Sequence, residues 1–174
     1  MPHAGRRNAA LVGGDTYIME KNPFDCEASM NEAAPRLERV LETVLYVDDF
    51  ARACPFYERI LGLPCIYKDQ RLNAYDVGGQ GVLLLFRRGQ SLQTVTLPGG
   101  TIPPHDGHGP VHIAFSIAAD ALDAWEARLQ EAGVGIEART RWPRGGTSIY
   151  FRDPDGHLLE LATPGLWTGY LSLV

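Results

Sequence analysis

Three ionisable side chains interrupt apolar runs of the sequence: Glu42 in VLETVLYV, His112 in PVHIAFSI and Glu160 in HLLELAT. Carboxylates and imidazoles are the side chains that most often bind divalent cations or transfer protons. Glu42 also fits a solvated residue at a strand start, and His112 fits a core histidine with satisfied nitrogens. Glu160 is harder to explain in that way, because burial of a lone carboxylate between two leucines is costly. Its side chain must therefore face water or have a partner.

The elements that carry Glu42 are predicted by the first half of the chain. Residues 40–47 are an apolar, β-branched run that ends at two aspartates. Asp49 to Leu61 then places apolar residues on one helical face, and Gly62 closes the helix. Three short apolar segments with Gly or polar turns between them predict further strands. These segments are 64–69, 72–77 and 81–88.

The same order of elements returns about seventy residues later. His112 lies in a predicted strand at 110–117, a helix follows from Ala119 to Ala132, and Gly133 ends it. Three more predicted strands follow, with an Asp-Pro-Asp-Gly turn before the last one. Their ranges are 135–142, 147–153 and 157–163.

This repetition predicts an α+β fold of two tandem βαβββ modules. Glu42 and His112 hold matching places, 70 residues apart. A Gly- and Pro-rich stretch separates the two halves and predicts a linker. The predicted parts are an N-terminal extension at 1–37, module one at 38–96, the linker at 97–109, module two at 110–166 and a C-terminal tail at 167–174.

Three segments of this repeat resemble the vicinal-oxygen-chelate superfamily of glyoxalases, fosfomycin-resistance proteins and extradiol dioxygenases. LETVLYVDDFARACPFYERILGL resembles the family's opening strand and helix, VHIAFSI the strand that opens its second module, and RDPDGHLLELAT its closing hairpin. Together they cover about residues 38–166. The resemblance implies two curved mixed sheets around a shared metal cleft, which a partner subunit often completes.

The resemblance also implies the metal ligands, because the family places them on the first and last strands of each module. Those positions hold Glu42, Leu84, His112 and Glu160. Three protein ligands leave coordination positions open for water and substrate, as in catalytic sites. Leu84 departs from glyoxalase I, which has a fourth ligand there, and Glu42 replaces the first histidine of fosfomycin-resistance enzymes and extradiol dioxygenases.

The implied cofactor is one divalent metal ion, with Mn, Zn, Ni, Co, Mg and Fe as candidates. Two carboxylates offset its charge and favour Mn²⁺, Mg²⁺ or Zn²⁺ over an O₂-activating Fe²⁺ centre.

Other polar residues lie near the predicted cleft. His105 and His108 fall in the linker and have an ordinary role as exposed loop residues. If the linker folds over the cleft, His105 is the candidate for a fourth ligand or a general base. His157, in the turn before the last strand, is expected to be exposed. Four further side chains are candidates either for holding an anionic substrate or for the plain surface: Tyr46, Arg87, Arg144 and Tyr150.

Two functions remain open at this point. The first is a metal-dependent enzyme for a small oxygenated substrate, whose reaction is a lyase, isomerase, epoxide-opening or ring-cleaving one. The second is a metal-free module that sequesters an antibiotic, as bleomycin-resistance proteins of the family do. A role as an interaction module within a larger assembly has only the N-terminal extension in its favour. The Glu, His and Glu set favours the enzyme. We expect a homodimer in which Glu42 of one chain joins His112 and Glu160 of the other.

Composition limits the partners. The chain has 174 residues and a formal net charge of -5, so no basic field favours nucleic acid. Its apolar runs are far shorter than the ~20 residues that cross a bilayer. Three cysteines without CxxC spacing indicate no disulfide framework and fit a reducing cytoplasm. Residues 1–37 lack periodicity and a signal-peptide core, which predicts a flexible extension without export.

Overall fold

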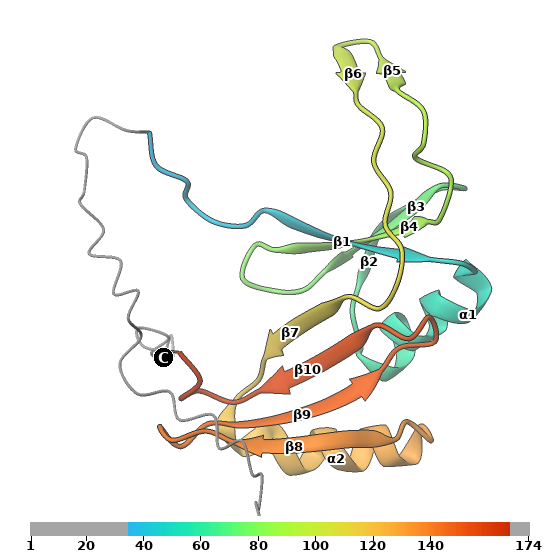
Figure 1. Cartoon of the computed structure of the whole chain (residues 1–174). Helices are drawn as coiled ribbons and strands as arrows, with labels where there is room; N and C mark the ends of the chain where they lie inside the picture. The colour runs from blue at the N-terminus through green and yellow to red at the C-terminus, as the bar shows by residue number, and fades with distance from the viewer. Residues whose placement is uncertain (1–34, 168–174) are drawn as a thin grey trace, which may run out of the picture. The chain divides into compact units, whose positions relative to one another are not determined.

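Two four-stranded sheets dominate residues 35–167, the part of the chain that the computed structural model describes (Figure 1). The first sheet contains β1 (Glu42–Val47), β2 (Cys65–Lys68), β3 (Leu72–Asp76) and β4 (Val82–Arg87). Its order is β1-β4-β3-β2, with β1 parallel to β4 and the other pairs antiparallel.

The second sheet repeats this topology. It contains β7 (His112–Ser116), β8 (Ile136–Arg141), β9 (Thr147–Arg152) and β10 (Leu158–Ala162), in the order β7-β10-β9-β8. Again the first and last strands are parallel and the remaining pairs antiparallel. The predicted order of two βαβββ modules is confirmed, and each module has one mixed sheet.

The first helix lies where the sequence predicted it, but it is not a single α-helix. Asp49 caps it by accepting a hydrogen bond from the Ala51 N–H. α1 (Phe50–Pro55) then widens into the π-helix η1 (Phe56–Ile60). Pro55 lies inside the helix and has no N–H to donate, which interrupts the α-helical ladder at that point.

The second helix follows the prediction closely. A 3₁₀ turn, η2 (Ala119–Ala121), leads into α2 (Leu122–Glu131). Gly133 has a φ of +70°, a left-handed conformation that suits a glycine after a helix end. Leu129 is the fully buried residue of α2 and joins the core.

One apolar core is shared by both modules. Strand alternation sends every second residue of β1, β4, β9 and β10 to the same side, where the helices pack. Module one contributes Leu45, Val47, Ala53, Phe56, Tyr57, Leu61, Tyr75, Leu83 and Leu85, and module two contributes Leu129, Ile149, Phe151, Leu159 and Leu161. The opposite faces of the two sheets are thereby left to the candidate site residues.

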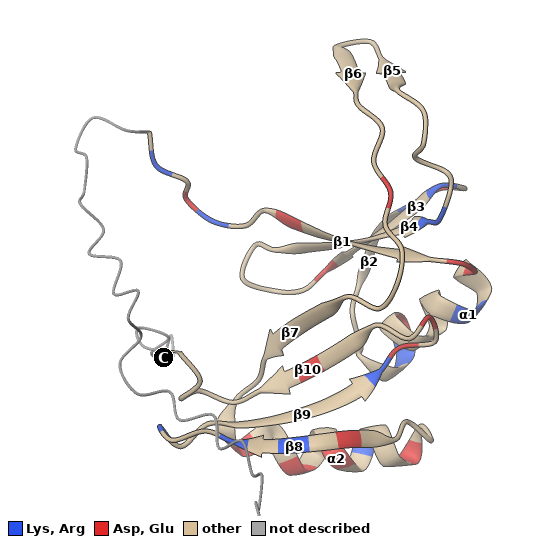
Figure 2. Ribbon diagram, in the orientation of Figure 1, with Lys and Arg blue, Asp and Glu red and all other residues tan. Residues whose placement is uncertain are grey.

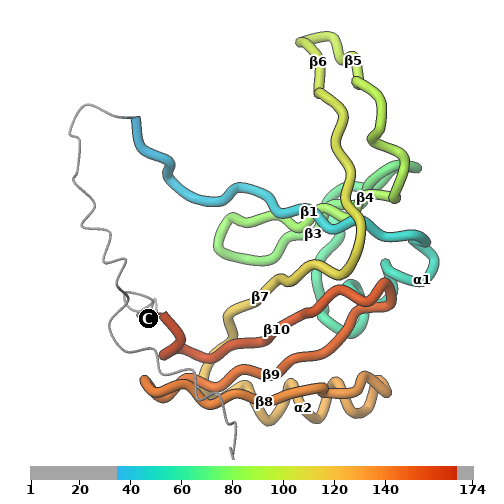
Figure 3. The backbone as a smooth tube through the Cα atoms, viewed as in Figure 1, coloured from blue at the N-terminus to red at the C-terminus, as the bar shows by residue number. Residues whose placement is uncertain are grey.

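The predicted linker is not wholly irregular. β5 (Val95–Leu97) and β6 (Gly100–Ile102) form a two-stranded hairpin between the modules, which the sequence prediction missed. In Figure 3 the backbone leaves β4, runs out through this hairpin and returns to β7. Gly100 has a φ of +149°, which a residue with a side chain rarely adopts, so the Gly-Gly pair permits the turn.

The predicted flexibility of the N-terminal extension concerns residues 1–34 for the most part, and these lie outside the described residues, as do 168–174. Within the described part, residues 35–41 are exposed and have no regular structure. None of the described helices has the length and apolarity that a bilayer crossing requires.

Candidate metal centre

His112 and Glu160 meet on the second sheet. His112 opens β7, and Glu160 lies in the middle of the neighbouring parallel strand β10, where its register partner is Ala114. The side chains point to the sheet face opposite the core, because Ile113, Leu159 and the other alternate residues pack inward. His112 Nε2 lies 3.2 Å from Glu160 Oε2.

The hydrogen bonds of this pair leave room for a cation. The Nδ1–H of His112 donates to the Leu158 carbonyl at 3.0 Å, so Nε2 of a neutral imidazole directs its lone pair at the carboxylate. Glu160 is 4% exposed, and its Oε1 is buried without a hydrogen-bond partner among the described residues. A lone pair facing a carboxylate requires a proton or a metal ion between them. These two residues therefore fit a cation site.

Tyr150 borders the same spot. It lies on β9 as the register partner of Glu160, and its ring centroid is 6.3 Å from that of His112. Burial raises the pKa of Tyr150, and the negative charge of Glu160 raises it further. The phenol consequently stays protonated at neutral pH and is a hydrogen-bond donor.

Glu42 belongs to the other sheet. Glu42 is the first residue of β1, whereas Glu160 lies within β10. Figure 2 shows acidic ribbon at the start of β1 and within β10. Glu42 is exposed and shares its strand face with Val44 and Tyr46. Within residues 35–167 of one chain, no three His, Cys, Asp or Glu side chains lie close enough together to hold a metal ion. The chain thus brings together two of the three predicted ligands.

An apolar surface surrounds Glu42's side of the first sheet. Leu84 faces that side, in register with Val44, and it is buried with Ala74 and Phe86. The position of the fourth ligand in glyoxalase I is therefore held here by an apolar side chain.

His105 lies on the first sheet as well. Its Nδ1 is 2.6 Å from the Tyr46 hydroxyl, and its ring meets Phe86 edge-on, with centroids 4.8 Å apart. The strap, residues 103–109 of the linker, carries His105 and is held by two hydrogen bonds. The His105 N–H donates to the Ser91 carbonyl, and the Arg88 Nε–H donates to the Gly107 carbonyl. The linker therefore does fold over module one, whereas His108 is exposed.

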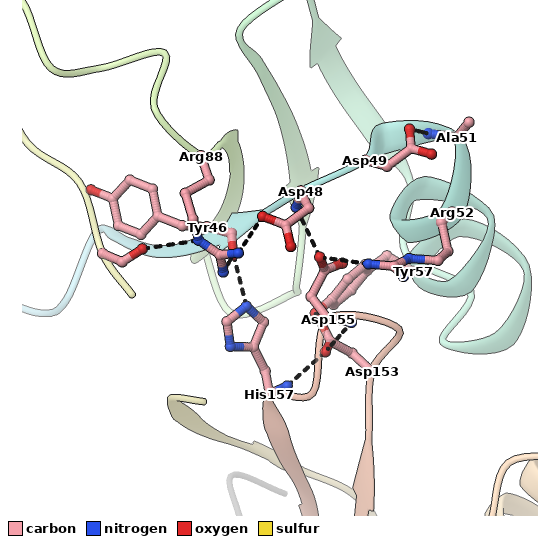
Figure 4. A network of polar contacts seen from close by, with 11 residues as sticks. Tyr46, Asp48, Asp49, Ala51, Arg52, Tyr57, Arg88, Asp153, Asp155 and His157 are labelled. Carbon is pink, nitrogen blue, oxygen red and sulfur yellow. Dashed lines mark hydrogen bonds and ion pairs between the residues drawn. The ribbon is translucent and has the colours of Figure 1, made fainter. Parts of the chain in front are cut away.

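His157 was expected to be exposed, and that expectation is wrong. It is 1% exposed, its Nε2–H donates to the Tyr46 carbonyl at 2.9 Å, and its Nδ1 accepts from the Val111 N–H. Figure 4 shows it beside Asp153, whose carboxylate accepts the His157 N–H. Hydrogen bonds to Asp153 and Asp155 hold the turn against β1. Because this packing involves residues far away in the sequence, the local turn pattern does not predict it.

The same network joins the two modules at further points. Asp155 accepts hydrogen bonds from the Asp48 N–H and from Arg52, and Asp153 accepts one from the Tyr57 hydroxyl (Figure 4). These contacts fix the start of β10, and with it Glu160, relative to β1.

Both arginines suggested either for an anionic substrate or for the plain surface, Arg87 and Arg144, are exposed. Arg144 donates to the Leu166 carbonyl at 2.6 Å, which gives it a structural role. Arg87 is exposed at the end of β4.

Comparisons with known proteins agree with this architecture. Residues 39–161 match the Glyoxalase/Bleomycin resistance protein/Dioxygenase superfamily. The Metallothiol transferase FosB of Bacillus licheniformis is 32% identical over 118 residues, which cover 67% of this chain and 70% of that protein. The Glutathione transferase FosA of Serratia marcescens is 29% identical over 126 residues, covering 72% and 80% of the two chains.

A solved structure extends the comparison to three dimensions. The lactoylglutathione lyase from Agrobacterium tumefaciens superposes with a TM-score of 0.69 at 31% identity, covering 76% of this chain and 98% of that one. The match spans both modules, and the resemblance drawn from the strands and the Asp-Pro-Asp-Gly turn is confirmed. The chain therefore belongs to the Glyoxalase/Bleomycin resistance protein/Dioxygenase superfamily.

Proposed function

We propose that the protein is a divalent-metal-dependent enzyme for a small oxygenated substrate, with Glu42, His112 and Glu160 as the metal ligands. The observation that supports the proposal is the facing pair of His112 Nε2 and the buried Glu160 carboxylate, whose Oε1 has no hydrogen-bond partner within residues 35–167. The names of the relatives support catalysis over sequestration, since they describe two transferases and a lyase.

The donor atoms of these three residues also restrict which metal ions can bind. Mn, Zn, Ni, Co, Mg and Fe all bind imidazole and carboxylate groups, and two carboxylates favour Mn²⁺, Mg²⁺ or Zn²⁺. When bound, the ion would supply Lewis-acid polarisation of adjacent substrate oxygens. The Leu158 carbonyl accepts the Nδ1–H of His112 and so orients its Nε2 for ligation. The protonated Tyr150 hydroxyl would be available as a hydrogen-bond donor to a substrate held there.

We further propose that two chains complete the site as a homodimer. Glu42 lies apart from His112 and Glu160 within one chain, so a partner's first sheet is the source of the third ligand. This exchange would place an exposed carboxylate of β1 over the exposed face of the second sheet.

His105 is our candidate acid–base residue from the first module. Its Nδ1 is engaged by Tyr46, and its Nε2 makes no hydrogen bond to any described residue. An imidazole nitrogen without a hydrogen-bond partner can donate a proton to a substrate or accept one from it.

Metal analysis tests this function. Purified protein equilibrated with Mn²⁺ or Zn²⁺ should retain one ion per chain, and Glu160→Ala should weaken retention by at least about tenfold. Glu137→Ala is the matched control, because Glu137 is an exposed carboxylate paired with Arg152. His105→Ala should retain the metal, whereas a fourth ligand would lose it.

A wild-type protein that binds neither ion in excess would refute the metal site. That result would favour the metal-free sequestering protein instead.

A further inference from the structure

A cavity lies on the second sheet beside the His112–Glu160 pair. Its volume is about 140 Å³. β7 and β10 form its floor, and the segment after β10 forms its wall. The floor is lined by Ala114, Phe115, Ser116 and Ala162, and the mainly apolar wall by Thr163, Pro164, Gly165, Leu166 and Trp167. Because the Phe115 side chain packs against the core, the floor side chains on the cavity face are small.

The strand register places this cavity next to the candidate metal position. Ala114 is the direct partner of Glu160 across the parallel pair, and Ser116 is the partner of Ala162 one step further along. Alternate residues of a strand share a face, so these side chains lie on the same face as His112 and Glu160. From Glu160 to Ala162 the strand advances two residues, roughly 6.6 Å, so a group attached to oxygens at the metal position would reach the cavity.

Close packing and hydrogen bonds hold the wall segment in place. Gly165 packs so closely on the backbone that an added Cβ would lie 2.5 Å from the Gly146 nitrogen, and its φ is +108°. Arg144 donates to the Leu166 carbonyl, and Thr163 Oγ1 accepts the Thr147 N–H. The turn between β8 and β9 thus fixes the wall from outside.

The size and lining indicate the ligand chemistry. A cavity of about 150 Å³ accommodates one benzene molecule. The floor side chains that face the cavity are small, and the indole of Trp167 in the wall is suited to contact with an aromatic ring.

We infer that this cavity is a specificity pocket for an aromatic or similarly compact apolar substituent of the substrate, adjacent to the oxygens that the metal would hold. The inference rests on the proposed function and adds a substrate class to it. Substrates with two adjacent oxygens and a neighbouring ring should therefore be preferred over those that carry only a methyl group.

Two hydroxamates test this pocket. Acetohydroxamate and benzohydroxamate chelate a metal through the same pair of oxygens and differ in a methyl against a phenyl group. Calorimetric titration of the metal-loaded dimer should give benzohydroxamate an affinity at least about tenfold higher, because the phenyl ring leaves water.

Ser116→Leu fills the cavity and should reduce the affinity ratio to about one or two, with acetohydroxamate binding retained. Gly165→Ala displaces the wall and should lower the ratio without touching the floor. Gln130→Leu adds the same leucine on the exposed face of α2 and should leave the ratio unchanged.

Equal affinity of the wild-type, metal-loaded protein for the two hydroxamates overturns the inference alone. So does a ratio that both pocket variants leave intact. A wild-type protein that fails to load metal overturns the proposed function instead, and metal content measured before each titration separates the two results.

Discussion

Tyr57 and Asp153 form a buried polar contact between the modules. The Tyr57 hydroxyl donates to Asp153 Oδ2 at 2.7 Å, and both side chains are at most 5% exposed. Tyr57→Phe should lower the free energy of unfolding by about 1.5–3 kcal/mol, since the hydrogen bond is to a carboxylate in the core. Urea unfolding measures this loss. Tyr67→Phe is the control, because its hydroxyl contacts Asp69 at the exposed surface, and it should cost less than about 0.5 kcal/mol. Equal stability of Tyr57→Phe and the wild type would contradict the contact's importance.

The same tyrosine makes stability sensitive to alkaline pH. Burial raises the pKa of Tyr57 well above its ordinary value of 10.0, and the charge of Asp153 raises it further. The folded state therefore holds the phenol proton more tightly than the unfolded state does. This contribution is complete below pH 10 and is lost as pH rises through and above that value.

The urea midpoint should consequently fall between about pH 9.5 and pH 11, and the fall should be smaller in Tyr57→Phe. A midpoint with the same pH slope in both proteins would exclude Tyr57 as the source.

At the scale of single residues, the sequence predicted some of the site and missed some of it. The sequence left Glu160 either facing water or paired, and the structure has it buried beside His112. The role of His157 could not be predicted, because its burial depends on a contact with the Tyr46 carbonyl, 111 residues away. Local turn chemistry carries no information about such a contact.

At the scale of elements, the strap over β1 depends on one small residue. A Cβ at Gly107 would lie 2.6 Å from the Tyr46 ring, which His105 and Phe86 already flank. Gly107→Ala should lower stability by about 1–3 kcal/mol and displace the strap, as overpacking does. Gly99→Ala is the matched control in the same linker, because no atom of the described part of the chain lies within 4 Å of its added Cβ. Thermal unfolding compares the two, and similar losses in both would exclude the close approach as the cause.

The periodicity of apolar residues predicted the helices and strands of both modules in the correct order. It missed the β5–β6 hairpin and the π-helix. The β5–β6 hairpin was within reach of the sequence, since Val95 and Leu97 alternate with polar residues before a Pro-Gly-Gly turn. The π-helix after Pro55 could not be predicted, because apolar spacing over five residues does not distinguish a wider helical turn from an α-helical one.

At the scale of the whole molecule, the position of Glu42 predicts an assembly. If two chains exchange modules, a heterodimer of Glu42→Ala and Glu160→Ala has one site with all three ligands. Dissociation, mixing and reassembly of the two inactive variants should then restore one metal ion per heterodimer, while each homodimer binds none. Metal content of the isolated heterodimer is the measurement. No recovery in a verified heterodimer would place all ligands in one chain.

The polar network of Figure 4 also has a consequence for the order of folding. Its contacts between the two modules link residues 96 to 111 positions apart, whereas the strands of each sheet pair within one module. Closing such long loops is entropically unfavourable until both modules exist, so the network should form after the transition state. Its loss should then accelerate unfolding and leave the refolding rate nearly unchanged, a pattern that a denaturant chevron of Asp155→Ala can reveal. The contacts that align β10 with β1 would thus set how long a folded chain lasts, rather than how quickly it forms.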